Sequence, residues 1–122
     1  MEASLRRADG SVVCERLVLA DTPPARLRGL LGRRELPAGE GLLLRPSGSI
    51  HTAFMRFPID AVFLDRGLTV LSVARNVAPW RMAAKRGARA VLELAAGEAE
   101  RVGLEPGERL YAEAASAGTP AS

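Results

Sequence analysis

The residues best suited to catalysis or binding gather in one stretch of the chain, residues 41–65. It contains the only histidine, His51, and Arg56 and Asp60 follow closely. A carboxylate that orients an imidazole is a recurring arrangement for acid–base chemistry, and an arginine can hold an anionic substrate. A structural role also accounts for them: Asp60 would accept backbone N–H groups at the Pro58–Ile59 turn, and His51 would be a satisfied core side chain.

A second candidate is the pair Trp80 and Arg81, in a stretch expected to be a loop over residues 76–87. An exposed Trp–Arg pair is typical of binding hot spots. The alternative is that Trp80 covers the open end of a barrel as a core residue. Cys14, within an apolar stretch, is interpreted as a small buried hydrophobe, and nothing in the sequence places it beside His51 as a nucleophile.

Composition excludes several classes of protein. One cysteine cannot form an internal disulfide, and one His with one Cys cannot build a usual zinc site. An Mg²⁺ site made of oxygen ligands stays open, but the carboxylates are scattered along the chain, and we expect no metal and no cofactor. Of the 17 basic residues only Lys85 is a lysine, and the arginines are dispersed among acids, which argues against nucleic acid as a partner. No apolar run approaches the ~20 residues of a membrane span. With no secretory signal, a cytoplasmic protein is expected.

Turn residues divide the chain into short apolar segments. Seven of these are predicted as strands: 12–20, 42–44, 50–57, 60–65, 68–74, 90–94 and 109–114. The strand 50–57 is expected to be interior, because both of its faces carry apolar residues. Glu93 alternates with Leu92 and Leu94 and is expected to face solvent.

Helix signals are few: one helix is predicted at 24–31 and one or two turns at 97–104. At 122 residues the chain is one domain, 1–122, with an ordered core over about 11–114 and a flexible tail at 115–122. The predicted fold class is mainly β, an antiparallel sandwich or partly open barrel with one or two short helices.

An ordered set of segments resembles the prokaryotic domain-of-unknown-function family 192 (DUF192). These segments are Arg28–Arg33, Gly41–Leu43, Ile50–Met55, Pro58–Asp65, Val91–Gly97 and Gly103–Gly107. The resemblance covers roughly Leu17 to Glu113 and implies a compact, mainly β domain. It brings no established reaction, cofactor or catalytic residue. Ala53 and Arg56 stand where many members have Trp and Lys, so an aromatic contact would be absent there.

The preferred functional hypothesis is a small binding or interaction module. Its polar pocket would lie near the segment from His51 to Asp60, with Arg56, Trp80 and Arg81 as further candidate ligand-binding residues. The partner would be a small polar ligand or a protein. The alternative is a small hydrolase-like or acid–base enzyme using His51 and Asp60, so whether the chain is an enzyme stays open. A weaker alternative is nucleic-acid binding through the dispersed arginines.

Overall fold

The computed structural model describes residues 2–20, 36–52 and 55–114. Most of these residues form short strands around a single helical turn. The elements are β1 (Glu2–Arg7), β2 (Val12–Ala20), β3 (Glu40–Leu44), β4 (Ser49–His51), β5 (Ile59–Leu64), β6 (Val70–Val77), β7 (Met82–Ala84), β8 (Ala90–Ala95), α2 (Glu98–Arg101) and β9 (Leu110–Ala114). The mainly β class is therefore confirmed. The expected helix at 24–31 and the expected tail at 115–122 lie outside the described residues.

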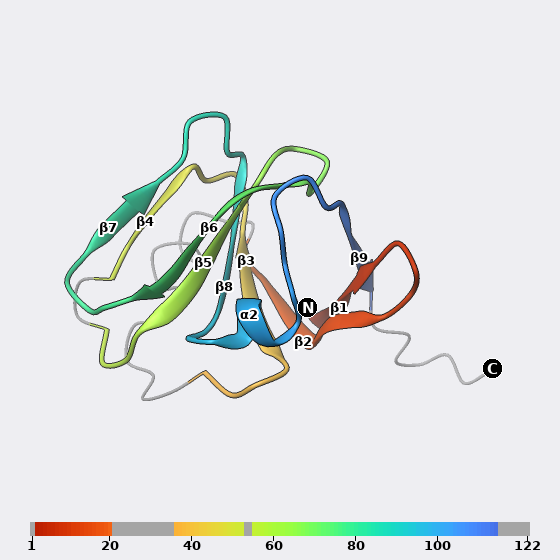
Figure 1. The fold of residues 1–122 in the computed structure, drawn as a ribbon, viewed down its shortest axis with the longest axis horizontal. Coiled ribbons are helices and arrows are strands. Elements are labelled where there is room, and N and C mark those ends of the chain that lie inside the picture. The colour runs from red at the N-terminus through yellow and green to blue at the C-terminus, as the bar shows by residue number, and fades with distance from the viewer. Residues whose placement is uncertain (1, 21–35, 53–54, 115–122) are drawn as a thin grey trace.

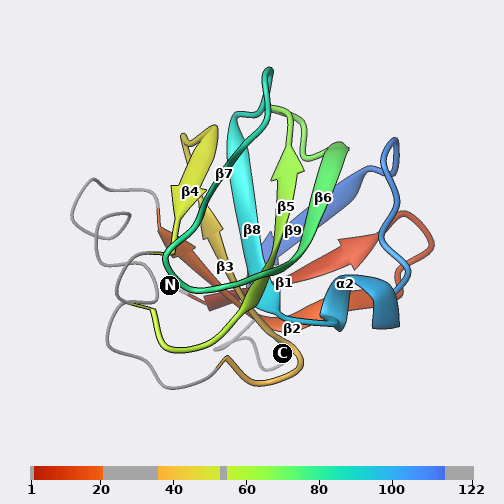
Figure 2. The ribbon, with the colours of Figure 1, turned by 60° about the vertical axis from the view of Figure 1, so that its left-hand side comes forward.

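Seven strands form one sheet in the order β6-β5-β8-β3-β2-β1-β9 (Figures 1 and 2). Every neighbouring pair is antiparallel except β2 and β3, which run parallel. This pair departs from the antiparallel arrangement expected from sequence. The physical reason is the long connection over residues 21–39, since parallel neighbours need a crossover of about a dozen residues or more.

The two edge strands of the sheet, β6 and β9, meet at one end. Thr69 and Arg109 form an isolated antiparallel bridge. On either side of it, the Val70 N–H donates to the Glu108 carbonyl at 2.8 Å and the Leu110 N–H donates to the Leu68 carbonyl at 2.9 Å. The sheet is thus curled until its edges touch, without closing into a complete barrel.

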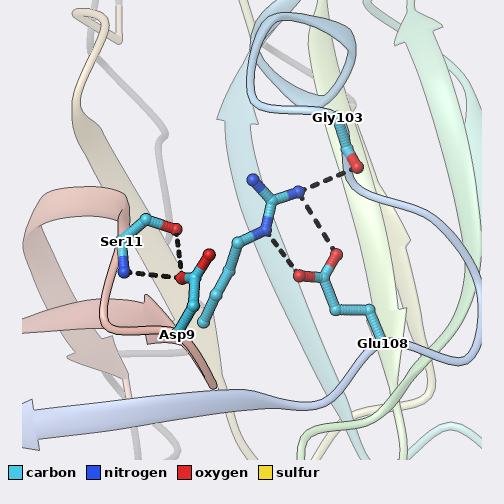
Figure 3. A network of polar contacts seen from close by, with 5 residues as sticks. Asp9, Ser11, Gly103 and Glu108 are labelled. Carbon is cyan, nitrogen blue, oxygen red and sulfur yellow. Dashed lines mark hydrogen bonds and ion pairs between the residues drawn. The ribbon is translucent and has the colours of Figure 1, made fainter.

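An ion pair ties β1 to the segment that leads into β9. The Arg7 guanidinium binds the Glu108 carboxylate through Nε and Nη2, and Nη2 also donates to the Gly103 carbonyl at 2.8 Å (Figure 3). The hydrogen bond to Glu108 raises the pKa of Arg7. In the β1–β2 turn, Asp9 Oδ1 accepts the Ser11 N–H at 2.8 Å and its hydroxyl at 2.6 Å. These contacts hold a strand that lies before the expected start of the ordered core at residue 11.

The main sheet buries apolar side chains on both faces because its strands alternate between two cores. The first cluster includes Leu92 and Leu94 of β8 and extends to Ala99 of α2. The second cluster, on the opposite face, includes Val91 of β8 and Ile50 of β4. The sheet is therefore covered on both sides, by α2 on one and by β4 on the other.

A two-stranded antiparallel ribbon of β4 and β7 covers the second cluster. This corrects two expectations: the strand predicted at 50–57 ends at His51, and the loop predicted at 76–87 contains β7. Thr52 explains both. Its N–H donates to the Arg81 carbonyl at 2.8 Å, and its carbonyl accepts the N–H of Trp80 at 2.9 Å and of Met55 at 3.1 Å. The backbone of Thr52 thus ends one strand and positions the start of the other.

Gly41 marks the tightest approach inside the first cluster. A Cβ atom there would lie 3.1 Å from Cys14 Sγ and Leu94 Cδ2. Gly41→Ala is expected to lower the free energy of unfolding by about 1 kcal/mol in urea denaturation, because crowding outweighs the entropy that alanine removes from the unfolded chain. Gly67→Ala is the control, because its Cβ would meet nothing closer than 3.6 Å. Equal midpoints for the two variants would contradict the crowding argument.

Candidate functional site

Thr52 fixes the segment that carries the exposed tryptophan. The Thr52 side chain is fully buried; its hydroxyl donates to the Ala78 carbonyl at 2.7 Å and accepts the Arg81 N–H at 2.7 Å. Trp80, between these two contacts, has a φ of 64°, which is uncommon for a residue other than glycine. The side chain and the backbone of the buried Thr52 thus hold residues 78–81 next to the end of β4. These contacts fix the backbone position of Trp80.

The ribbon turns its larger side chains toward solvent. His51 pairs with Met82 across the ribbon, while the neighbouring pair, Ile50 and Ala83, packs into the second cluster. Met82 is 76% exposed and Trp80 is 60% exposed. The interpretation of Trp80 as a buried barrel cover is therefore wrong. We call His51, Trp80, Arg81 and Met82 the ribbon surface.

Three of the five predicted site residues, His51, Trp80 and Arg81, are exposed near one end of the ribbon. Arg56 is exposed and makes no hydrogen bond or ion pair with the described part of the chain. Met82 is a further residue of the ribbon surface that was not among the predicted ones, because the sequence predicts a loop over residues 76–87. Its signal would have been the alternation of Met82, Ala83 and Ala84, but three residues are too few to establish a period.

Asp60 lies on the other side of the main sheet. It is 1% exposed, and strand alternation directs it to the face of the first cluster, next to α2. Its Oδ1 accepts the Asn76 N–H at 2.9 Å, and its Oδ2 accepts the N–H of Gly97 at 3.0 Å and of Ala99 at 2.9 Å. The structure therefore does not bring Asp60, which is buried on β5, to His51, which is exposed on β4.

Both structural roles considered for this pair need correction. His51 is exposed and so is not a core side chain. Asp60 does accept backbone N–H groups, as that alternative required, but they come from β6 and the start of α2 and not from the Pro58–Ile59 turn. A shallow cavity of about 280 Å³ adjoins Asp60, lined by Asp60, Arg75, Asn76, Ala96, Gly97 and Glu100. Because three N–H groups already occupy the Asp60 carboxylate, it offers this cavity little free hydrogen-bonding capacity.

Glu93 was expected to face solvent, and that expectation is wrong. The residue is 4% exposed, and among the described residues its Oε1 has no hydrogen-bond partner. Burial raises the pKa of the Glu93 carboxyl to about 7. Alternation with Leu92 and Leu94 was read correctly as a change of face. The opposite face, however, is covered by the ribbon and the second cluster, so both faces of β8 are buried.

Cys14 is a buried member of the first cluster, as predicted. Burial raises the pKa of its thiol to about 12, so the reactive thiolate is disfavoured at neutral pH. His51 lies outside the second cluster, beyond the main sheet from Cys14, and the two do not form a nucleophile–base pair.

Charged residues are unevenly distributed along the chain, although the net charge is only +3. Residues 41–59 and 66–92 contain no Asp or Glu. Together they carry eight of the 17 basic residues, namely Arg45, Arg56, Arg66, Arg75, Arg81, Lys85, Arg86 and Arg89. These two stretches include both strands of the ribbon. The ribbon is therefore built from stretches of the chain that carry basic residues and no acidic ones.

Within residues 2–20, 36–52 and 55–114, no group of three or more His, Cys, Asp or Glu side chains is arranged to hold a metal ion. No helix in that part of the chain has the length and hydropathy to cross a bilayer.

Comparison with known proteins gives a consistent result. The chain is 31% identical over 111 residues to a UPF0127 protein from Thermococcus sibiricus, covering 87% of this chain and 71% of that one. It resembles the crystal structure of a "putative transcription regulator" from Sinorhizobium meliloti, with a TM-score of 0.79, 27% identity and coverage of 91% and 92% of the two chains. A protein of unknown function from Novosphingobium aromaticivorans gives a TM-score of 0.74, 25% identity and coverage of 91% and 84%. The model of the DUF192 family (Uncharacterized ACR) matches residues 5–112, so the chain belongs to this uncharacterised family.

Proposed function

We propose that this chain is an interaction module that binds an acidic segment of a partner protein on the ribbon surface. The observation that carries the proposal is the exposure of Trp80 and Met82 beside His51 and Arg81. Aromatic residues, methionine and arginine are the residue types enriched in protein interfaces, and Trp and Arg dominate binding hot spots. A partner that covers the two apolar side chains would remove them from water.

Charge specifies the kind of partner. Arg81 and the following Lys85 and Arg86 are exposed, and no acid lies between residues 66 and 92. A basic surface accelerates encounter with acidic partners and disfavours basic ones. A single tryptophan provides little for the successive base stacking that single-stranded nucleic acid uses, which favours a protein segment.

The enzyme alternative has less support. It requires His51 and Asp60 to act on one substrate, yet one is exposed on the ribbon and the other is buried on the opposite face of the sheet. The ribbon surface is the better candidate because it needs no rearrangement of the sheet.

Trp80 makes the proposal directly testable, because it is the only tryptophan in the chain and its fluorescence reports on the surface itself. Titration with a Glu- and Leu-containing peptide is expected to change Trp80 emission, whereas the same peptide with Gln for Glu is expected to bind at least about tenfold more weakly. Met82→Ala and Arg81→Ala are each expected to weaken binding by about tenfold or more.

Matched controls lie outside the ribbon surface. Arg66→Ala removes an exposed arginine from the β5–β6 turn, and Tyr111→Ala removes an exposed aromatic residue from β9. Both are expected to bind the acidic peptide as the unmodified chain does. Equal binding of the Glu and Gln peptides, equal loss in the control variants, or tighter binding of a single-stranded oligonucleotide would each overturn the proposal.

A further inference from the structure

Glu93 is a buried acid on an interior strand of the main sheet. Its strand, β8, lies between β3 and β5. The Oε1 atom is buried and, within the described part of the chain, accepts no hydrogen bond. Buried polar atoms are almost always paired, because leaving one unpaired is unfavourable. A group of this kind is a candidate for contact with a ligand.

The surface around Glu93 has small side chains on one side. The register places Leu42 of β3 and Ala61 of β5 directly beside Glu93. Ala61 in turn pairs with Ala74 of β6, and Ala95 lies two residues further along β8 on the same face. Toward β6, the carboxyl group is therefore next to methyl groups, whereas other positions on this face carry larger residues such as Phe63.

Solvent reaches the edge of this surface. Ala74 and Ala95 pack against the second cluster but are only partly buried, and β6 is an edge strand of the sheet. We call Ala61, Ala74 and Ala95 the alanine floor. Ala61 is fully buried under the second cluster, whereas Ala74 and Ala95 are partly exposed. A small molecule that approached across β6 would therefore meet Ala74 and Ala95 first, and would direct its polar end at Glu93 by displacing the side chains over Ala61.

The chain itself supplies no cation for Glu93 among the described residues. Glu40 of β3 shares this face by alternation, but it is paired with Arg16, with Nη1 and Oε2 3.8 Å apart. Arg75 of β6 points to the opposite face, where its Nη1 lies 3.7 Å from Glu100 Oε1. Asp60 of β5 also belongs to that opposite face, and His51 of the ribbon points outward. None of these groups would therefore compete with an external cation for the Glu93 carboxylate.

We propose that Glu93 and the alanine floor form a binding site for a small organic cation, an alkylammonium or alkylguanidinium with a short apolar chain. The cationic N–H would donate to Glu93 Oε1, and the alkyl chain would cover the floor. A charge-assisted hydrogen bond of this kind satisfies the unpaired atom and neutralises the carboxylate in one step. The site lies beneath the ribbon and is separate from the ribbon surface proposed for a protein partner.

The test uses n-butylammonium and n-butylguanidinium, with n-butanol as the neutral probe. Amide chemical shifts in NMR spectra are expected to change at Ala61, Ala74 and Ala95 with the cations, with at least about tenfold weaker binding of n-butanol. Calorimetry at pH 6.5 in buffers of different ionisation enthalpy is expected to show proton release on binding, because the cation ionises a carboxyl whose pKa is about 7.

Two variants test whether the cation binds at Glu93 and on the alanine floor. Glu93→Gln is expected to abolish proton release and to weaken cation binding at least tenfold, with Glu105→Gln, an exposed acid, as the matched control. Ala74→Leu keeps Glu93 but fills the floor, and is also expected to weaken binding. Undiminished binding to Glu93→Gln, equal binding of n-butanol, or no shift at the floor with any probe would overturn the proposal. Trp80→Ala should leave cation binding unchanged, so this test does not depend on the ribbon surface.

Discussion

Asp60→Ala is expected to lower the free energy of unfolding by about 4 kcal/mol. The substitution removes the acceptor from three backbone N–H groups, at Asn76, Gly97 and Ala99, in a place that is almost fully buried. Hydrogen bonds to a charged acceptor contribute about 1.5–3 kcal/mol each, and water that enters the vacated space recovers part of the loss. Urea denaturation measures the change. Hydrogen exchange at Gly97 and Ala99 should accelerate, because those N–H groups lose their partner.

Asp65 is the matched control for Asp60. It also accepts two backbone N–H groups through one oxygen, from Gly67 and Thr69 at 2.9 Å, but in a partly exposed turn. Asp65→Ala is expected to cost about 1 kcal/mol, because water can replace the lost acceptor there. Asp60→Asn should fall between the two, since it keeps one carbonyl oxygen. If Asp60→Ala costs no more than Asp65→Ala, the carboxylate does not hold β6 and α2 to β5 as described.

The apolar pattern of β5 predicts the strand itself but not the hydrogen-bond partners of Asp60. The pattern of residues 59–64 was sufficient to predict β5, because a run of apolar residues that includes Val62 and Phe63 is typical of a buried strand. The same pattern does not say which elements pack next to Asp60. Its partners lie 16 to 39 residues further along the chain, and only the packing of β6 and α2 against β5 brings them there.

Strands with weak local signals depend on tertiary pairing and were not found from the sequence. β1 contains Glu, Ala, Ser and Arg, residues with little preference for strands, yet it pairs with β2 on one side and β9 on the other. The strand predicted at 50–57 had a strong local signal but is shorter than predicted. Its alternation was real over Ser49–His51, but Thr52 uses its backbone to hold residues 78–81, so the strand cannot continue.

The candidate site was partly predictable for a similar reason. Trp80 and Arg81 could be selected by residue type, because a Trp–Arg pair in a predicted loop indicates a binding hot spot without knowledge of the fold. The sequence hypothesis also placed His51 and Asp60 in the same pocket as these two residues. The pairing of β4 with β7 gives His51 its place near them, whereas Asp60 lies on the other face of the main sheet. Glu93 was misjudged because a sequence shows that a side chain changes face and does not show what covers that face.

Ionisation of Glu93 is expected to lower the free energy of unfolding by about 3 kcal/mol as the pH rises from 4.5 to about 7. Above that pH the contribution of Glu93 no longer changes. The pKa of this carboxyl is raised in the folded state from 4.5 to about 7, so the folded protein holds a proton that the unfolded chain has already lost. Stability linked to this proton is fully present below the unfolded pKa and is lost as pH rises through the folded pKa, at about 1.4 kcal/mol for each unit of difference.

Glu93→Gln isolates this effect, because glutamine keeps the shape of the side chain but cannot ionise. Relative to the unmodified chain, it should be stabilised at pH 8 by up to about 3 kcal/mol and nearly unchanged at pH 4.5, as measured by urea denaturation at each pH. Taking the difference between the two proteins cancels acids with the opposite behaviour, such as Asp9 and Glu98, whose pKa values are lowered by hydrogen bonds. Glu105→Gln should follow the unmodified chain at every pH. A Glu93→Gln difference that stays constant across this window would mean that the carboxyl is already hydrated or paired in solution, and the reason to seek a cationic ligand for it would disappear.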